Sequence, residues 1–270
     1  MEAAQEAAGL VLITGASGIV GTILRHHWSG VATAGAPARP PPFRLRLADL
    51  RPPDGDLHPH EHFTPFDLTS LDDCRRICEG VSTVVHLAAD PGSEDFVDSL
   101  LPKNLLGPYN LLEGAVAAGV GRVILTSSIY AVRGHGPSPP ITADRPTYPE
   151  GLYGATKTFL EAMGRVYSDT HGLSTVVVRL GNPRMEQGNV EQVPTDDPTY
   201  TLTPRDCAQL FERCVQAALP EPFNIVHGSS EHRRMFLDIE STQRLLGYEP
   251  RDGTRFERRP TGDLTFSGRM

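Results

Sequence analysis

Short apolar runs alternate with longer amphipathic segments over the first two thirds of the chain. The apolar runs predict buried strands at residues 10–13, 44–48, 83–87, 122–126 and 175–179. The amphipathic segments predict helices that run through Trp28 and over residues 72–78, 110–118 and 153–169. Strands that are apolar throughout suit a sheet covered on both faces, and their alternation with helices is typical of parallel βαβ units. The pattern therefore predicts an α/β fold built on a doubly wound parallel sheet.

The length of 270 residues fits one large α/β domain, or one domain with a small appended lobe. We predict a single Rossmann-type nucleotide-binding domain over residues 1–270, with the elements of a small C-terminal substrate lobe mainly in 182–270. Two proline-containing segments with few apolar residues, 137–149 and 182–203, are expected to build the substrate site. Long loops at the carboxyl ends of strands do this in open α/β sheets.

The first predicted strand leads directly into a glycine-rich turn with the sequence Thr14-Gly15-Ala16-Ser17-Gly18-Ile19-Val20-Gly21. Glycine allows the tight turn at the first position, close approach of a pyrophosphate at the second, and packing of the helix on the strand at the third. The following helix would present unpaired N–H groups and a positive dipole to the phosphates. The spacing thus predicts a dinucleotide site, with a glycine-rich turn that binds nothing as the alternative.

The second predicted strand ends in Asp49-Leu50, where a carboxylate could accept both hydroxyls of an adenosine ribose and would repel a 2′-phosphate. This favours NAD over NADP, although three arginines nearby in the sequence leave NADP open. Asp67-Leu68, after a third strand, is placed to meet the adenine. The cap of the next helix is expected at Thr69 or Ser70.

The strand at 122–126 delivers Ser127 and Ser128 at its carboxyl end, and a predicted helix opens with Tyr153 and Lys157. Residues four apart share one face of a helix. A phenol is a poor base at neutral pH, but a nearby ammonium favours the phenolate and lowers the phenol's pKa. Ser128 would hold a substrate hydroxyl against Tyr153, which would remove its proton while hydride passes to the cofactor. Tyr-x-x-x-Lys also occurs by chance on helices.

Charge and cysteine content narrow the possible partners. The net charge is −8 with acidic residues spread along the chain, which argues against nucleic acid, because phosphate binding needs clustered cations. No run approaches the ~20 apolar residues of a membrane span, and the N-terminus lacks the features of a secretory signal, so a cytoplasmic location is expected. Cys74 and Cys78 are expected to be buried thiols. His58-x-His60-x-His62 lacks Asp or Cys at ligand spacing, so no metal site is predicted.

Four stretches make the chain resemble the extended (atypical) short-chain dehydrogenase/reductase superfamily, which includes NAD-dependent nucleotide-sugar epimerases and dehydratases. They are ITGASGIVG at 13–21, VHLAA at 85–89, NLLE at 110–113 and YGATK at 153–157. The likeness continues to RLLGYEP at 244–250. Three further stretches resemble uronate dehydrogenases most: LADL at 47–50, GPYNL at 107–111 and PEGLYG at 149–154.

The resemblance implies NAD as the cofactor and assigns roles to particular residues. Ser128, Tyr153 and Lys157 become the catalytic group, and Asn104 matches the asparagine that helps to orient the lysine through water in this superfamily. The implied NAD contacts are Gly15, Ser17, Gly18, Ile19, Val20, Asp49, Leu50, Asp67, Leu68, Leu87, Ala88, Ala89, Asn104, Tyr153, Lys157 and Asn182. The expected substrate contacts are Ser93, Ser128, Ile129, Tyr130 and Tyr153.

Two departures from uronate dehydrogenases bear on the substrate. Those enzymes have Asn-His after the catalytic serine, where this chain has Ile129-Tyr130. They also bring an arginine to the substrate carboxylate, where this chain has Asp196 or Asp197, and carboxylates would repel a uronate. Arg184 or Arg133 could supply a cation from elsewhere. The departures argue against a hexuronate and leave a neutral sugar or another secondary alcohol open.

The leading hypothesis is an NAD-dependent dehydrogenase that oxidises a secondary alcohol of a small, sugar-like substrate. The alternative enzyme is a nucleotide-sugar epimerase or dehydratase that retains NAD, and the short C-terminal part counts against it. A non-catalytic NAD-sensing protein is a further alternative, disfavoured because the serine, tyrosine and lysine are all present. By analogy with the superfamily, the helices at 110–118 and 153–169 would pair in a homodimer.

Overall fold

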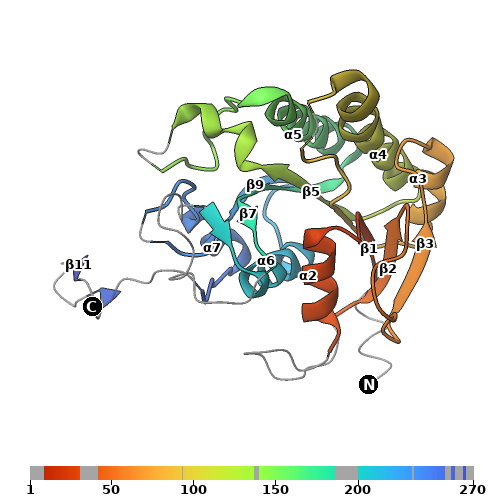
Figure 1. The fold of residues 1–270 in the computed structure, drawn as a ribbon, viewed down its shortest axis with the longest axis horizontal. Coiled ribbons are helices and arrows are strands. Elements are labelled where there is room, and N and C mark those ends of the chain that lie inside the picture. Colours follow the sequence, from red (N-terminus) through yellow and green to blue (C-terminus); the bar gives the residue numbers. More distant parts are fainter. Residues whose placement is uncertain are drawn as a thin grey trace.

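In the computed structural model, a seven-stranded parallel sheet lies between two layers of helices (Figure 1). The structure describes residues 9–30, 42–92, 94–136, 140–185, 200–232 and 234–252, and two short strands beyond them. Hydrogen-bonded neighbours in the sheet follow the order β3-β2-β1-β4-β5-β6-β9. The strand order therefore reverses between β1 and β4, and a dinucleotide binds at such a switch point in doubly wound sheets. The predicted Rossmann-type α/β fold is confirmed.

Each strand and helix predicted from the sequence overlaps an observed one. The sheet consists of β1 (Leu10–Thr14), β2 (Arg44–Asp49), β3 (Glu61–Pro65), β4 (Thr83–His86), β5 (Arg122–Ser128), β6 (Ser174–Leu180) and β9 (Phe223–Gly228). The α-helices are α2 (Ile19–Trp28), α3 (Leu71–Cys78), α4 (Gly107–Ala117), α5 (Gly151–His171), α6 (Pro204–Gln216) and α7 (Glu240–Leu246). A π-helix, η1 (Phe96–Leu106), precedes α4, and two 3-10 turns, η2 (Ile129–Ala131) and η3 (Arg133–His135), follow β5. The remaining strands form the pairs β7 (Asn182–Pro183) with β8 (Thr201–Leu202), and β10 (Glu257–Arg258) with β11 (Leu264–Thr265).

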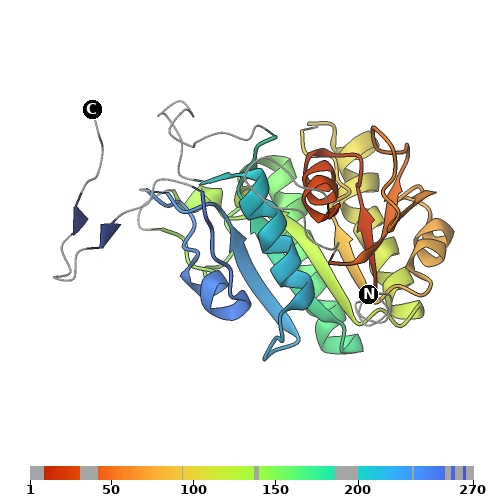
Figure 2. The same cartoon turned by 90° about the horizontal axis from the view of Figure 1, so that it is seen from below.

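Each face of the sheet has its own apolar cluster. Helices α2 and α6 pack together on one face, in front of the sheet in Figure 2, and Trp28 is fully buried there. Helices α3, α4 and α5 cover the other face, where Leu111 is fully buried. Along β1, Leu12 joins the second cluster and Ile13 the first. Alternate residues of a strand point to opposite faces, so a strand covered on both sides is apolar throughout.

Part of the lobe predicted for 182–270 belongs to the main layers. Strand β9 pairs with β6 along its whole length and forms one edge of the sheet. Helix α6 packs against α2. It begins at Pro204 because Thr203 accepts a hydrogen bond from the Asp206 N–H, and proline is favoured in the first turn. Strands β7 and β8 form a separate two-stranded pair, and helix α7 packs against β9.

All four cysteines are free and buried. Burial raises the pKa of the Cys74, Cys78 and Cys214 thiols to about 12, so they stay protonated at neutral pH. The interpretation of Cys74 and Cys78 as buried thiols is confirmed. Among the described helices, none has the length and apolar character needed to cross a membrane. The described residues also contain no group of three or more His, Cys, Asp or Glu that could hold a metal ion.

Candidate active site

The glycine-rich turn joins β1 to α2 under tight steric limits. Gly15 has a φ of +70°, and a Cβ there would lie 2.6 Å from the backbone nitrogen of Ala88. A Cβ at Gly21 would lie 2.5 Å from the carbonyl oxygen of Ala16. Glycine is therefore required for the turn itself and for the close packing of α2. Gly18 stands at the N-cap of α2 without a side-chain cap, which leaves the first N–H groups of the helix available to phosphates.

A cavity of about 440 Å³ opens in front of this turn. It is lined by residues at or just after the carboxyl ends of β1, β2, β3 and β4 and by three residues of η1: Gly15, Gly18, Asp49, Leu50, Phe66, Asp67, Leu68, Thr69, Leu87, Ala88, Ala89, Asp98, Pro102 and Lys103. Nine of the NAD contacts predicted from the sequence lie in this lining. A glycine cradle that no side chain can fill, next to a cavity with a carboxylate at its mouth, fits the adenosine and pyrophosphate of a dinucleotide.

Backbone N–H groups fix the carboxylate of Asp49 at the mouth of the cavity. Its Oδ2 accepts a hydrogen bond from the Ser17 N–H at 3.0 Å, and its Oδ1 accepts one from the Leu50 N–H at 2.7 Å. The hydroxyl of Ser17 donates to the carbonyl oxygen of Arg51 at 2.8 Å. A carboxylate has about four acceptor positions, so Asp49 keeps two for the ribose hydroxyls.

The structure bears on two further predictions at this cavity, the adenine contact at Asp67 and the cap of the helix that follows it. The side chain of Asp67 accepts hydrogen bonds from the backbone N–H and the hydroxyl of Thr69, at 2.9 and 2.7 Å. Ser70 caps α3, as one of the two predicted alternatives, by accepting a hydrogen bond from the Asp73 N–H. Of the remaining predicted NAD contacts, Ser17, Ile19 and Asn182 are exposed and Val20 packs against the core.

The predicted catalytic residues meet where β5 ends beside α5. Tyr153 and Lys157 lie one turn apart, and the Nζ of Lys157 is 5.4 Å from the centroid of the Tyr153 ring. The same Nζ donates a hydrogen bond to the carbonyl oxygen of Thr126 at 2.9 Å. Ser128, the last residue of β5, interacts with the phenol of Tyr153 and also accepts a hydrogen bond from the Tyr130 N–H at 3.2 Å. The structure therefore brings all three side chains together.

Burial governs the protonation of these groups. It raises the pKa of Tyr153 to about 12, while the interaction with Ser128 acts in the opposite direction. Burial also lowers the pKa of Lys157 to about 8. The sequence led us to expect a lowered pKa for Tyr153, and the structure differs. The ammonium lies beside the ring and donates to a backbone carbonyl, so desolvation of the phenolate outweighs its attraction.

Asn104 connects the segment after β4 to the catalytic helix. Its Oδ1 accepts a hydrogen bond from the Asp90 N–H at 2.8 Å, and its Nδ2 donates to the Asp90 carbonyl oxygen at 2.9 Å. The same Nδ2 donates to the hydroxyl of Thr156 at 3.3 Å. Thr156 precedes Lys157 on α5, so Asn104 sets the distance between the lysine and the segment that borders the cofactor cavity.

Two residues near the site carry chemistry that the sequence analysis did not assign. His86 is buried, its Nδ1 lies 2.8 Å from the hydroxyl of Thr14, and burial together with the charge of Lys157 lowers its pKa to about 3. It therefore stays neutral beside the lysine. Lys103 lines the cofactor cavity from η1 and forms an ion pair with Asp90 at 3.3 Å. A π-helix that contains a proline has no sequence pattern by which Lys103 could have been found.

The predicted substrate contacts have different environments. The ring of Tyr130 packs edge-on against that of Tyr153, with centroids 5.9 Å apart, and is 37% exposed. Ile129 is 2% exposed and packs in a small apolar cluster with Val132 and Phe236, so a contact from it would come through its backbone. Three of the residues that the sequence analysis discussed for the substrate lie outside the described ranges: Ser93, Asp196 and Asp197.

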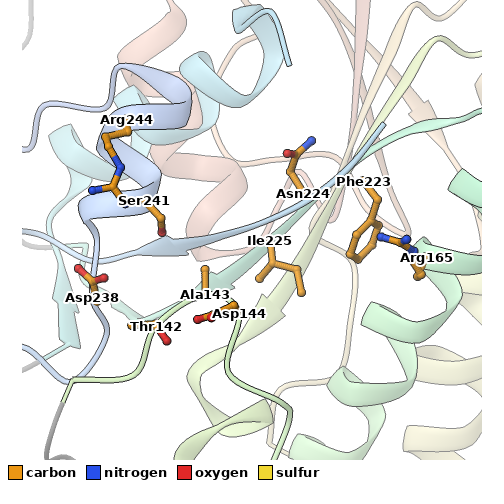
Figure 3. Close-up of a pocket in the computed structure, with 10 residues that line it drawn as sticks. All are labelled: Thr142, Ala143, Asp144, Arg165, Phe223, Asn224, Ile225, Asp238, Ser241 and Arg244. Atoms are coloured by element: carbon orange, nitrogen blue, oxygen red, sulfur yellow. The ribbon is translucent and has the colours of Figure 1, made fainter. Parts of the chain in front are cut away.

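A second cavity, of about 620 Å³, lies between β9, α7 and the segment 142–144 (Figure 3). Its polar groups include Asp144, Asp238 and Arg244. Its Thr142, Ala143 and Asp144 belong to the segment 137–149 that was expected to help build the substrate site, but none of the individually predicted cofactor, catalytic or substrate residues lines it. It is therefore separate from the cavity that the glycine-rich turn borders.

Comparison with known proteins agrees with this geometry. The model of the NAD dependent epimerase/dehydratase family matches residues 11–197. The chain is 32% identical to an NAD-dependent glucose-6-phosphate dehydrogenase from Haloferax volcanii, over 96% of each protein. It is 29% identical to a uronate dehydrogenase from Pseudomonas putida, over 90% of this chain and 84% of that protein. The crystal structure of a uronate dehydrogenase from Agrobacterium tumefaciens is similar with a TM-score of 0.75 and 29% identity, over 91% of this chain and 85% of that one.

Proposed function

The chain belongs to the NAD-dependent epimerase/dehydratase family and is an NAD-dependent oxidoreductase, and we propose that it oxidises a secondary alcohol of a sugar-like substrate. One observation carries this proposal: Tyr153 and Lys157 lie one turn apart on α5 beside Ser128 at the end of β5, the strand that pairs with β4, whose following residues line a cavity that fits a dinucleotide. The names of the relatives support a sugar, since they include dehydrogenases of glucose 6-phosphate, L-arabinose and uronates.

In the proposed reaction, the hydroxyl of Ser128 binds the oxygen of the substrate alcohol and holds it at the phenol of Tyr153. In its phenolate form, Tyr153 accepts the proton of that alcohol as a general base. NAD, when bound, supplies the acceptor for the hydride that leaves the same carbon. Because the pKa of Tyr153 is about 12 in this structure, the transfer depends on groups that favour the phenolate. The hydroxyl of Ser128 is one such group in this structure, and we propose the ammonium of Lys157, one turn along α5, as the second.

Replacement of the phenol tests this role. We expect Tyr153→Phe to lower the rate of NADH formation by about 10²-fold or more, because a lost general base costs 10²–10⁴-fold. NAD affinity, measured by the quenching of protein fluorescence, should change by less than about twofold, since the ring still packs against Tyr130. Tyr109→Phe is the matched control, because this tyrosine is 42% exposed on α4. Retention of more than a tenth of the wild-type rate in Tyr153→Phe would rule out the proposed base.

The state of the cofactor after purification separates the dehydrogenase from an epimerase. A dehydrogenase releases NADH in each turnover, so the protein should be purified with little nucleotide and should need added NAD. Stoichiometric NAD that survives gel filtration, together with activity without added NAD, would instead indicate an epimerase or dehydratase. A protein that binds NADH but turns over no sugar or alcohol would indicate an NAD sensor.

We also propose that the protein forms a homodimer through α4 and α5, and that it is located in the cytoplasm. Both helices lie on the same face of the sheet and carry exposed apolar side chains, Tyr109 on α4 and Phe159 and Val166 on α5. The four free thiols support a reducing compartment. Light scattering at micromolar concentration should give twice the mass of 29.3 kDa. A monomer that persists at this concentration would contradict the proposed assembly.

A further inference from the structure

A cation lies close to the proposed catalytic phenol. Arg133 begins η3, five residues after Ser128. Its guanidinium carbon is 5.0 Å from the centroid of the Tyr130 ring and 6.0 Å from that of Tyr200. The ring of Tyr130 in turn packs edge-on against Tyr153. The guanidinium and the Tyr153 ring therefore contact the same aromatic ring.

Surrounding contacts hold this guanidinium in a fixed position. Two tyrosine rings beside a planar cation restrict its orientation through cation–π attraction. The segment before α5 adds two backbone hydrogen bonds, from the Gly134 N–H to the Tyr148 carbonyl oxygen and from the Glu150 N–H to the Tyr130 carbonyl oxygen, each 2.9 Å long. The turn that carries Arg133 is thus tied to the start of the catalytic helix.

The guanidinium keeps donors for a further anion. Within the described part of the chain, Glu150 is the carboxylate that pairs with Arg133, and the two groups approach through one oxygen and Nη1 at 3.5 Å. The side chain of Glu150 is 52% exposed and that of Arg133 30% exposed. A guanidinium has five N–H donors in a planar fork, so one long contact leaves most of them available.

We infer that Arg133 binds an anionic group, a carboxylate or a phosphate, at the end of the sugar substrate remote from the reacting carbon. This inference rests on the proposed function. The guanidinium carbon lies 5.0 Å and the Tyr153 ring centre 5.9 Å from the centre of the Tyr130 ring, so a sugar that lies along Tyr130 with its reacting hydroxyl at Tyr153 would bring a substituent on its far side towards the guanidinium. Arginine is suited to this role because its fork binds carboxylates and phosphates through two parallel hydrogen bonds. Arg133 is one of the two arginines, with Arg184, that the sequence analysis named as candidates for a cation at the substrate.

The test compares sugars that share a ring and differ in charge: glucose 6-phosphate, glucuronate and glucose. For wild type we expect a higher kcat/KM for one of the two anions than for glucose, and the preferred anion identifies the group as phosphate or carboxylate. Arg133→Ala should lower kcat/KM for that anion by about 10- to 100-fold, mainly through KM, because a remote contact acts equally on bound substrate and transition state. Turnover of glucose should stay within about threefold.

Two variants control for a structural role. Arg133→Lys keeps the charge and loses the fork, so it should recover part of the affinity for the anion. Arg75→Ala removes a comparably paired arginine on α3, where Arg75 contacts Asp72 at 3.4 Å, and should change neither substrate preference nor KM. An equal loss for glucose and for the anion in Arg133→Ala, or a wild type that prefers glucose, would overturn the inference.

A binding measurement separates this inference from the proposed reaction. Calorimetric titration of the NADH-loaded protein with glucose 6-phosphate and with glucuronate does not require turnover. If wild type binds one anion and Arg133→Ala binds it at least tenfold more weakly, the role of Arg133 stands even if no sugar is oxidised. If wild type binds neither anion more tightly than glucose, the inference fails even if glucose is oxidised.

Discussion

At the candidate site, burial of the charged Lys157 side chain lowers the stability of the folded protein. Its side chain is 5% exposed, and burial lowers its pKa to about 8. The charge of Lys157 contributes to the lowered pKa of the neighbouring His86, whose neutral imidazole offers no negative charge in return. Burial causes the lowered pKa, and within the part of the chain that the structure describes this ammonium forms no ion pair with a carboxylate. Such a group lowers the stability of the fold, and strongly shifted pKa values of this kind are typical of functional sites.

We expect Lys157→Met to unfold less readily than wild type at pH 7 while losing dehydrogenase activity. The folded pKa of about 8 lies below the ordinary value of 10.5, so the penalty for the buried charge is complete below pH 8 and disappears as the pH rises towards 10.5. Methionine removes this penalty but loses the hydrogen bond to Thr126, which leaves a gain on the order of 2 kcal/mol. Urea unfolding at pH 7 and pH 9.5 measures the difference between the two chains.

The gain should shrink by about 1.4 kcal/mol for each pH unit above 8, because wild type recovers stability as its lysine loses the proton. Comparison of the variant with wild type at each pH cancels all other titrating groups. A difference that does not depend on pH, or a methionine variant that is less stable at pH 7, would contradict the burial of a charged lysine.

At the scale of elements, a buried ion pair holds α2 to β3. Arg25 and Glu61 are 3% and 0% exposed, and Nη2 lies 2.9 Å from Oε2. The guanidinium also donates to the carbonyl oxygens of Asp54 and Asp56, both at 3.3 Å, and so holds the segment that follows Asp49. The pair thus connects the helix of the glycine-rich turn to the border of the cofactor cavity.

We expect Glu61→Gln to lower the free energy of unfolding by about 3 kcal/mol or more, because it leaves the Arg25 charge buried and unpaired. The double variant Arg25→Met/Glu61→Leu should recover most of this loss, since an apolar pair of similar volume needs no desolvation. Urea unfolding gives both values, and Arg75→Ala on the surface should change stability by less than about 1 kcal/mol. A double variant as unstable as Glu61→Gln would show that packing, not charge, sets the cost.

The predictability of the elements follows from their position in the sheet. The five predicted strands are covered on both faces, and their sequences are apolar enough to be recognised. Strand β9 was missed because it forms the edge of the sheet, and its sequence Phe223–Gly228 mixes polar and apolar residues. Helix α6 was predictable in principle: Cys207, Leu210, Phe211 and Cys214 recur at helical spacing after the Thr203 cap. The sequence analysis assigned this segment only to the C-terminal lobe and predicted no helix there.

The candidate site was predictable where a motif determines local geometry. The glycine turn and the Tyr153–Lys157 spacing act within one turn or one helix, so the sequence alone placed them. The pKa of Tyr153 was not predictable, because it depends on burial by Tyr130 and on where the Lys157 ammonium points. The position of Arg133 likewise depends on the packing of Tyr130 between distant segments of the chain.

At the scale of the whole molecule, two neutral histidines are buried on strands far apart in the sheet. His86 lies on β4 and His227 on β9, with β5 and β6 between them. Burial lowers their pKa values to about 3 and about 4. Protonation of either one therefore requires that the sheet be opened, and the unfolded chain is the state in which both can bind a proton.

This arrangement predicts that the protein loses stability as the pH falls below 6.5. Each folded pKa is depressed from 6.5, so the unfolded state binds the extra proton and stability falls progressively towards pH 4 and pH 3. Between pH 7.5 and pH 5, each histidine should cost about 2 kcal/mol, in a range where few carboxylates titrate.

Urea unfolding at pH 7.5 and pH 5 tests this loss with His86→Asn and His227→Asn, in which an amide can take over the hydrogen bond of Nδ1. Each variant should lose about 2 kcal/mol less than wild type over this range, and the two effects should add, because the histidines share no partner. His26→Asn at an exposed position of α2 is the control and should leave the loss unchanged. If the buried-site variants lose as much stability as wild type, the acid sensitivity arises from other groups than these two imidazoles.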